Sequence, residues 1–140
     1  MSHKVRERLG NEVPAWNSQW NLAQTPYEQF SALMSRFISG DALFFDHDFN
    51  ALHRYENKVR NFNDGIWELK TADVRLFGWF CKFDCFVGVC IDEAWRVKSH
   101  RLYAGYRDEV IRFRNALGLD EPKFIPGGEP VNVVSNFYPA

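Results

Sequence analysis

The sequence predicts an α+β fold in which a small antiparallel sheet carries helices packed on one face. Three observations lead to this fold class. A helical spacing of apolar residues occupies 25–40 and returns at 102–117, an alternating pattern occupies 66–97, and the links between the expected strands are short enough for hairpins. The chain has 140 residues, of which 46% are hydrophobic and 16% aromatic, so it can hold one domain with a packed core.

The clearest helix signal is TPYEQFSALMSRFISG, residues 25–40. Thr25 and Glu28 form the T-x-x-E pattern of a capping box, Pro26 suits a first helical turn, and Gly40 follows the last apolar residue. We therefore expect a helix that starts after Thr25 and ends at Gly40.

Two further helices are expected. Residues 102–117 place apolar side chains on one face, and Gly118 follows them as a stop signal. Residues 48–62 have Asp48 as a candidate cap and apolar residues at helical spacing, namely Phe49, Leu52, Val59 and Phe62.

The sheet is expected to consist of three antiparallel strands at residues 66–70, 74–82 and 85–98. These segments are rich in Trp, Phe, Val, Cys and Ile, which suit a pleated surface. ALFF at 42–45 is a candidate short strand, and VNVV at 131–134 could add an edge strand or lie along the surface.

Residues 1–24 show no sustained helical or strand period, so we expect an N-terminal arm followed by a single α+β domain at 25–140. Trp16 and Trp20 are expected to be more than half buried, because two indoles on a loose arm would favour aggregation. They would dock the arm on its own domain or on a second copy, which makes a homodimer through the arm a further expectation.

One core is expected to join the helices to one face of the sheet. Its predicted members are Phe30, Leu33, Phe37, Leu52, Val59, Phe77, Val89, Val110 and Phe113.

Composition favours a cytoplasmic protein without a membrane partner. No run of 18 apolar residues occurs, and the first residues lack the apolar centre of a signal peptide. The three cysteines are odd in number and lie in one apolar stretch, which suits reduced thiols. Their spacing does not fit zinc, and His47, Asp48 and His53 lack the i, i+4 spacing of a helical metal pair, so no metal or cofactor is expected.

The candidate site is a set of cations near the sheet. Lys70 and Arg75 face each other across the predicted first hairpin, and Arg75 lies too deep in an apolar run to be an ordinary surface charge. The expected third strand delivers Lys98 at its end, with His100 just beyond. With net charge −1 the chain has no general attraction for polyanions, so these four residues are expected to converge on the helix-free face as a local anion site.

Such a site suits RNA cleavage by attack of the 2′-hydroxyl. A base must remove a proton, cations must stabilise the pentacoordinate phosphate, and an acid must protonate the leaving oxygen. We assign Lys70, Arg75, Lys98 and His100 as catalytic candidates. A structural role is equally open for each, because a strand arginine commonly pairs with a neighbouring carboxylate.

Residues 65–117 resemble the sheet and C-terminal part of the RelE/ParE toxin superfamily, and especially its phage-derived HigB-like branch. The resemblance lies in IWELK, in VRLFGWF and in WRVKSH, which leads into a helix. It covers about half of the chain and implies a RelE-like fold. The doubled lysine of the family is reduced here to VKSH, and the first 40 residues have no counterpart.

The resemblance implies a toxin of a toxin–antitoxin system that cleaves mRNA on the ribosome without a metal, with an antitoxin protein, the ribosome and mRNA as partners. Lys70, Arg75 and Lys98 match the family's basic positions, and His100 and Tyr103 fall where members place proton-transfer or base-stacking residues. The alternative is a non-catalytic binding or accessory protein of the same fold, such as a ParE-like inhibitor of a partner. Substrate-binding candidates are Arg96, Arg101 and Tyr103.

Overall fold

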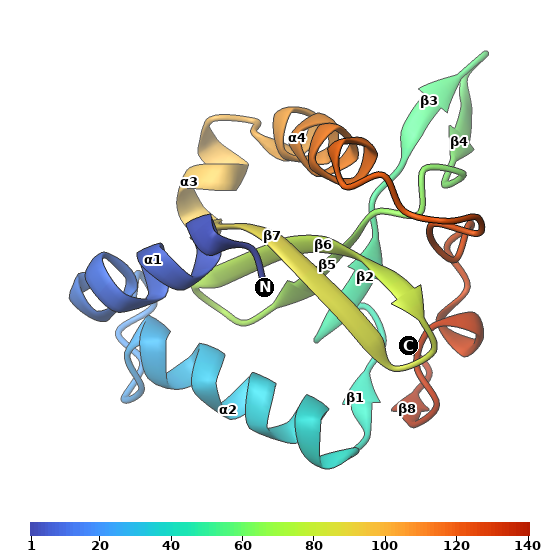
Figure 1. The fold of residues 1–140 in the computed structure, drawn as a ribbon. Helices are drawn as coiled ribbons and strands as arrows, with labels where there is room; N and C mark the ends of the chain where they lie inside the picture. The colour runs from blue at the N-terminus through green and yellow to red at the C-terminus, as the bar shows by residue number, and fades with distance from the viewer.

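The computed structural model describes residues 1–140 and is built on a four-stranded antiparallel sheet (Figure 1). Its strands lie in the order β2 (Phe49–Ala51), β5 (Trp67–Lys70), β6 (Val74–Lys82) and β7 (Cys85–Glu93). Short turns join β5 to β6 and β6 to β7, as predicted for residues 66–82. The α+β class and the small antiparallel sheet are therefore confirmed.

Helices cover both faces of this sheet, so the expectation of helices on one face is wrong. α1 (His3–Asn11) and α2 (Pro26–Ser39) lie on one side, whereas α3 (Ala94–Ser99) and α4 (Tyr103–Ala116) lie on the other (Figure 1). The physical reason is visible in β6, where both faces carry large apolar side chains that need cover: Leu76 and Phe80 on one face, Phe77 and Trp79 on the other.

The hydrophobic residues accordingly form two cores. One joins the sheet to α1 and α2 around Trp67, Leu76 and Phe80, and the other joins it to α3 and α4 around Phe77 and Trp79. Of the predicted members, Val59 is wrong, because its side chain is 66% exposed. Phe37 and Phe113 are partly buried at the edges of the two cores, and the remaining six are buried: Phe30, Leu33, Leu52, Phe77, Val89 and Val110.

The first and last predicted helices are confirmed. Thr25 and Glu28 form the capping box of α2, and Gly40 ends that helix with a left-handed φ of 78°. α4 spans Tyr103–Ala116, one residue shorter at each end than the predicted segment.

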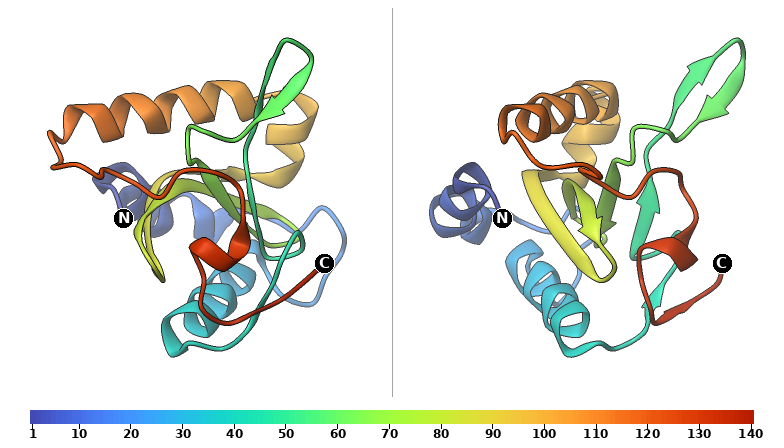
Figure 2. Two further views of the ribbon diagram at one scale, coloured as in Figure 1. Left: turned by 90° about the vertical axis from the view of Figure 1, so that its right-hand side faces the viewer. Right: turned by 45° about the vertical axis from the view of Figure 1, so that its right-hand side comes forward.

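The helix predicted at 48–62 is wrong. These residues form β2 and then a hairpin of β3 (Arg54–Glu56) and β4 (Val59–Asn61), which projects from the body of the protein (Figure 2). Asn57 and Lys58 both have positive φ values, of 51° and 67°, as a two-residue hairpin turn requires.

Asp48 is therefore not a helix cap. Its buried carboxylate instead accepts hydrogen bonds from the backbone N–H of Phe44 at 2.8 Å and from Arg36 at 3.1 and 3.2 Å. Burial alone would raise the pKa of Asp48, but these hydrogen bonds outweigh burial and hold the pKa below its usual range. Asp48 thus holds the segment that leads into β2 against α2.

The third strand ends at Glu93, and residues 94–98 turn into α3 rather than continuing the sheet. Val74 pairs with Glu93 as the first residue of β6, so no partner strand remains beyond that point. Arg96 and Lys98 consequently project from a helix and not from a strand end.

The remaining segments are short. β1 (Leu43–Phe44) lies in the predicted ALFF strand and pairs in parallel with β8 (Phe137–Tyr138). A 3₁₀ turn, η2 (Pro130–Asn132), opens the VNVV segment, which forms no strand and buries its two final valines. No helix combines the length and apolar character needed to cross a bilayer.

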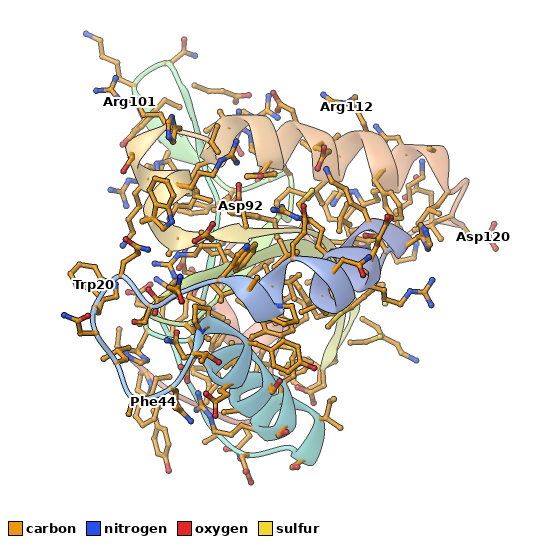
Figure 3. The ribbon with its side chains drawn as sticks, turned by 90° about the vertical axis from the view of Figure 1, so that its left-hand side faces the viewer. Trp20, Phe44, Asp92, Arg101, Arg112 and Asp120 are labelled. Carbon is orange, nitrogen blue, oxygen red and sulfur yellow. The ribbon has the colours of Figure 1, made fainter.

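The N-terminal segment is ordered on its own domain. It contains α1 and a 3₁₀ turn, η1 (Val13–Ala15), and the side chains of Val5 and Val13 are fully buried in the first core. Trp16 packs against that core, whereas Trp20 is 66% exposed on the loop before α2 (Figure 3). The expected burial of Trp20 is wrong, because the aliphatic residues of α1 and η1 make the contact instead.

We predict that Val5→Ala lowers the free energy of unfolding by about 1.5 to 3 kcal/mol, because it removes two buried methyl groups and leaves a cavity. The matched variant Val59→Ala, on the exposed hairpin, should change it by less than about 0.5 kcal/mol. Urea denaturation measures both. Equal effects would show that α1 does not belong to the core.

Candidate active site

Charged side chains are buried between the sheet and α4. Glu68 on β5, Arg75 on β6 and Asp92 on β7 are 3%, 6% and 1% exposed. Arg75 lies directly opposite Lys70 on one neighbouring strand and opposite Asp92 on the other. The predicted pairing of Lys70 with Arg75 across the hairpin is confirmed, but the face that receives them is the one covered by α3 and α4, so the predicted helix-free face is wrong.

Arg75 is anchored by the backbone and only partly paired with an acid. Its Nη1 donates to the carbonyl oxygens of Thr71 and, at 3.0 Å, Val74. Its Nε lies 4.0 Å from Oε2 of Glu68, and neither of these two buried atoms has a hydrogen-bond partner. The two opposite charges thus lie at the limit of ion-pair distance, with no hydrogen bond between them.

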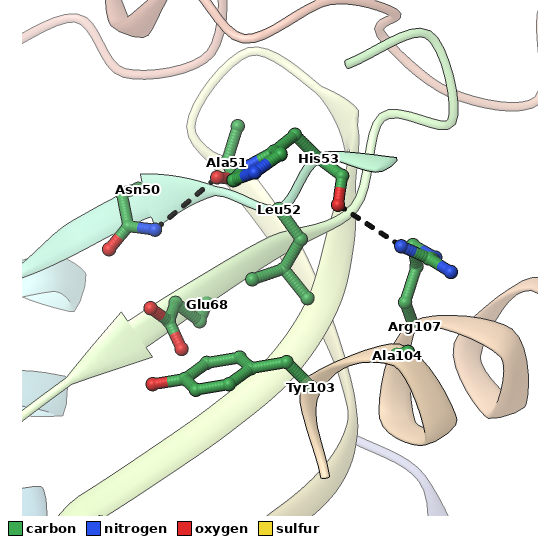
Figure 4. A pocket seen from close by; sticks show the side chains of 8 residues that line it. All are labelled: Asn50, Ala51, Leu52, His53, Glu68, Tyr103, Ala104 and Arg107. Atoms are coloured by element: carbon green, nitrogen blue, oxygen red, sulfur yellow. Dashed lines mark hydrogen bonds between the residues drawn. The ribbon is translucent and has the colours of Figure 1, made fainter. Parts of the chain in front are cut away.

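Glu68 lines a cavity of about 390 Å³ between β2, β5 and α4 (Figure 4). The ring of Tyr103 lies next to the Glu68 carboxyl, and Arg107 closes the side nearest His53 by donating to the His53 carbonyl oxygen at 3.0 Å (Figure 4). The lining residues are Asn50, Ala51, Leu52, His53, Glu68, Tyr103, Ala104 and Arg107.

Burial shifts the protonation of the groups around this cavity. It raises the pKa of Glu68 above its ordinary value, although Arg75, Lys70 and Lys98 act in the opposite direction. Burial also raises the pKa of Tyr103, helped by the Glu68 charge and opposed by Arg75. Burial lowers the pKa of Lys70, and the positive charges of Arg75 and Lys98 lower it further. Glu68 is therefore a better proton acceptor than an exposed glutamate, and Tyr103 keeps its proton.

Asp92 forms the inner boundary of the cluster. Its carboxylate accepts hydrogen bonds from Arg96 and from the hydroxyl of Tyr106, and Arg8 of α1 lies 3.9 Å away. Tyr106 in turn stacks on Phe77 with ring centroids 4.9 Å apart. These contacts join α1, α3 and α4 to β7. They also occupy the carboxylate of Asp92, which does not line the cavity.

The predicted site residues fall into two groups. Lys70, Arg75, Lys98 and Tyr103 all lie close enough to Glu68 for their charges or hydroxyl to act on it. Of these four only Tyr103 lines the cavity, and Arg96, His100 and Arg101 lie away from it. Arg96 is held by Asp92, His100 packs against Trp95 with ring centroids 6.1 Å apart, and Arg101 is exposed on the α3–α4 turn (Figure 3).

Of the eight lining residues only Tyr103 was a predicted site residue, and the polar ones that were missed are Asn50, His53, Glu68 and Arg107. Glu68 carried a usable signal, because it alternates with Trp67 and Leu69 and so shares a face with Lys70. Asn50 and His53 were hidden by the helix expected at 48–62. No group of three His, Cys, Asp or Glu side chains is placed to hold a metal ion.

Comparison of the chain with family models, curated proteins and solved structures gave no match. The likeness to the RelE/ParE superfamily therefore rests on the sequence motifs themselves.

We predict that Glu68→Gln becomes progressively more stabilising, relative to the natural chain, as pH rises from about 4 to 7. The folded-state pKa of Glu68 lies above the unfolded value of about 4.3, so its favourable contribution exists below that value and is lost as pH rises through the folded pKa. Melting temperatures across this range measure the difference. A difference that stays constant with pH would contradict the raised pKa.

Proposed function

We propose that this chain is a toxin-like endoribonuclease of RelE/ParE type, and that it cleaves ribosome-associated mRNA in the cavity between β2, β5 and α4. One observation carries the proposal: Oε2 of Glu68 and Nε of Arg75 are buried, lack partners and lie 4.0 Å apart. Glu68 also lines the cavity.

Both atoms are shielded from solvent, so the proposal requires the two side chains to part and admit a hydroxyl group, which suits both of them. Its proton can be donated to Glu68 while its oxygen accepts from Arg75, and one oxygen atom can lie at hydrogen-bond distance from both atoms. The ribose 2′-hydroxyl is such a group, and it distinguishes RNA from DNA. Occupation by a 2′-hydroxyl would therefore satisfy two buried atoms that are costly to leave unpaired.

The same placement supports chemistry. Glu68 takes the proton of the 2′-hydroxyl, and the 2′-oxygen forms a bond to the adjacent phosphorus while the bond from phosphorus to the 5′-oxygen breaks. Tyr103, which keeps its proton because its pKa is raised, donates it to the departing 5′-oxygen and regains one from solvent. The products are a 2′,3′-cyclic phosphate and a 5′-hydroxyl end.

The cations divide their work according to exposure. Arg75 is buried and donates to two backbone carbonyls, so it holds positive charge beside Glu68 rather than gripping a phosphate in solvent. Lys98 is exposed and Lys70 is partly buried; neither lines the cavity, and in the proposal their charges act from beyond its wall on the charge that develops on the phosphate.

The proposed partners are an antitoxin protein, the ribosome and mRNA, and a homodimer through the N-terminal segment is part of the same proposal. Inducible expression with and without the adjacent open reading frame tests the toxin role. Growth arrest and mRNA breakage that the neighbour relieves are the expected result. Harmless expression would favour the non-catalytic accessory protein instead.

We predict that Glu68→Gln lowers RNA cleavage about a hundredfold or more, as loss of a general base does, and removes the rise in rate with pH that Glu68 ionisation produces. Lys98→Ala should lower the rate about tenfold or more through lost charge stabilisation. The matched variant Lys82→Ala, an exposed lysine at the β6–β7 turn, should leave the rate unchanged. Cleavage by Glu68→Gln at the natural rate would refute the proposed mechanism.

A further inference from the structure

The β3–β4 hairpin carries two different faces. On one face Arg54 is paired with Asp64 at 2.6 Å, and Asn61 donates to Glu56 at 2.7 Å. On the other, Tyr55 and Arg60 lie directly opposite each other on the two strands. Arg60 has no acidic partner within ion-pair distance, and the Tyr55 side chain is 64% exposed. The first face is neutralised within the chain, whereas the second presents an aromatic ring beside a free cation.

The second face is continuous with the cavity. His53 precedes β3, lines the cavity and shares its strand parity with Tyr55, and the two rings lie edge to face with centroids 5.0 Å apart. Arg107 of α4 donates to the His53 carbonyl oxygen (Figure 4). Burial, together with the charges of Arg60 and Arg107, lowers the pKa of His53, which indicates that positive charge is concentrated here.

The hairpin has no evident packing role. β3 and β4 pair with each other and project from the domain (Figure 2). Exposed aromatic rings combined with cations are the elements by which proteins hold single-stranded nucleic acid, since a base stacks on the ring and the backbone phosphate meets the cation. An acidic peptide would use the cations but would not need the ring.

We propose that the face formed by His53, Tyr55 and Arg60, with Arg107 beside it, binds a nucleotide of single-stranded RNA that flanks the one in the Glu68 cavity. This inference rests on the proposed function for the identity of the nucleic acid. Tyr55 stacks on the base of that nucleotide and Arg60 holds its phosphate, whereas Arg107, which lies 3.5 Å from Asp108 and donates to His53, supports the position of His53. The hairpin therefore extends the substrate site beyond the reacting ribose.

The test uses single-stranded RNA with 2′-O-methyl sugars, which cannot be cleaved, and measures binding by fluorescence anisotropy at several salt concentrations. Tyr55→Ala should weaken binding about tenfold with an unchanged salt slope, because stacking involves no counterion release. Arg60→Ala should weaken binding and reduce the slope of log K against log salt by about 0.7, the value for one phosphate contact on a single strand. Tyr55→Phe, which keeps the ring, should bind like the natural chain.

Two matched controls lie away from the hairpin. Tyr138→Ala removes a comparably exposed tyrosine from β8, and Lys82→Ala removes an exposed cation from the β6–β7 turn. Both should leave binding unchanged. The inference is overturned if the hairpin variants bind as well as the natural chain, if the controls lose as much, or if the natural chain binds no single-stranded RNA.

Cleavage assays on ribosome-bound mRNA with unmodified sugars separate this inference from the proposed function. Hairpin-dependent binding by a chain that cleaves nothing would support the hairpin site and refute the nuclease. Cleavage that depends on Glu68 but not on Tyr55 or Arg60 would support the nuclease and overturn the hairpin site.

Discussion

The burial of a charged guanidinium between a sheet and a helix is the constraint on which this structure depends. Arg75 lies on β6, one of the two inner strands of the sheet, and is only 6% exposed. Its charge must therefore be compensated by groups on its own and neighbouring elements. The guanidinium donates to the carbonyl oxygens of Thr71 and Val74 at the β5–β6 turn. Glu68 on β5 lies 4.0 Å from it, and Asp92 on β7 lies opposite Arg75 in the strand register. The tight turn, the strand register and the position of α4 are thereby linked.

That charge is satisfied incompletely. A fully buried ion pair normally has hydrogen bonds to both partners, yet Glu68 and Arg75 leave one atom each without any. Proteins keep unsatisfied buried groups chiefly where those groups act on a ligand, because folding gains nothing from them. By contrast, the carboxylate of Asp92, which does not line the cavity, is engaged by Arg96 and Tyr106.

Local signals predicted part of the fold well. The capping box at Thr25 and the alternation in β5 and β6 concern neighbours in sequence, and both are confirmed. The helix prediction for residues 48–62 failed because four apolar residues fitted a helical period by chance. The turn at Asn57 and Lys58 was missed because it depends on positive φ values that lysine rarely adopts. Helices on the second face were missed because apolar residues of both parities in β6 were interpreted as one buried face.

Only the part of the site that follows from strand pairing was predicted. Lys70 and Arg75 are cross-strand neighbours, so parity and a short turn were sufficient to place them together. Glu68 shares that parity but was not among the predicted site residues. His53 and Arg107 meet through a contact between residues 54 positions apart, and no local pattern encodes such a contact.

The most direct test is the ¹³C NMR titration of the Glu68 carboxyl in the presence of a ribonucleoside 3′-monophosphate and of its 2′-deoxy counterpart. The ribonucleotide keeps the 2′-hydroxyl but has no leaving nucleoside, so it can present this hydroxyl to Glu68 and Arg75 without reacting. The account predicts a raised pKa for Glu68 in the free protein and a resonance that moves with the ribonucleotide but not with the deoxynucleotide. An ordinary pKa, or equal responses to the two nucleotides, would contradict it.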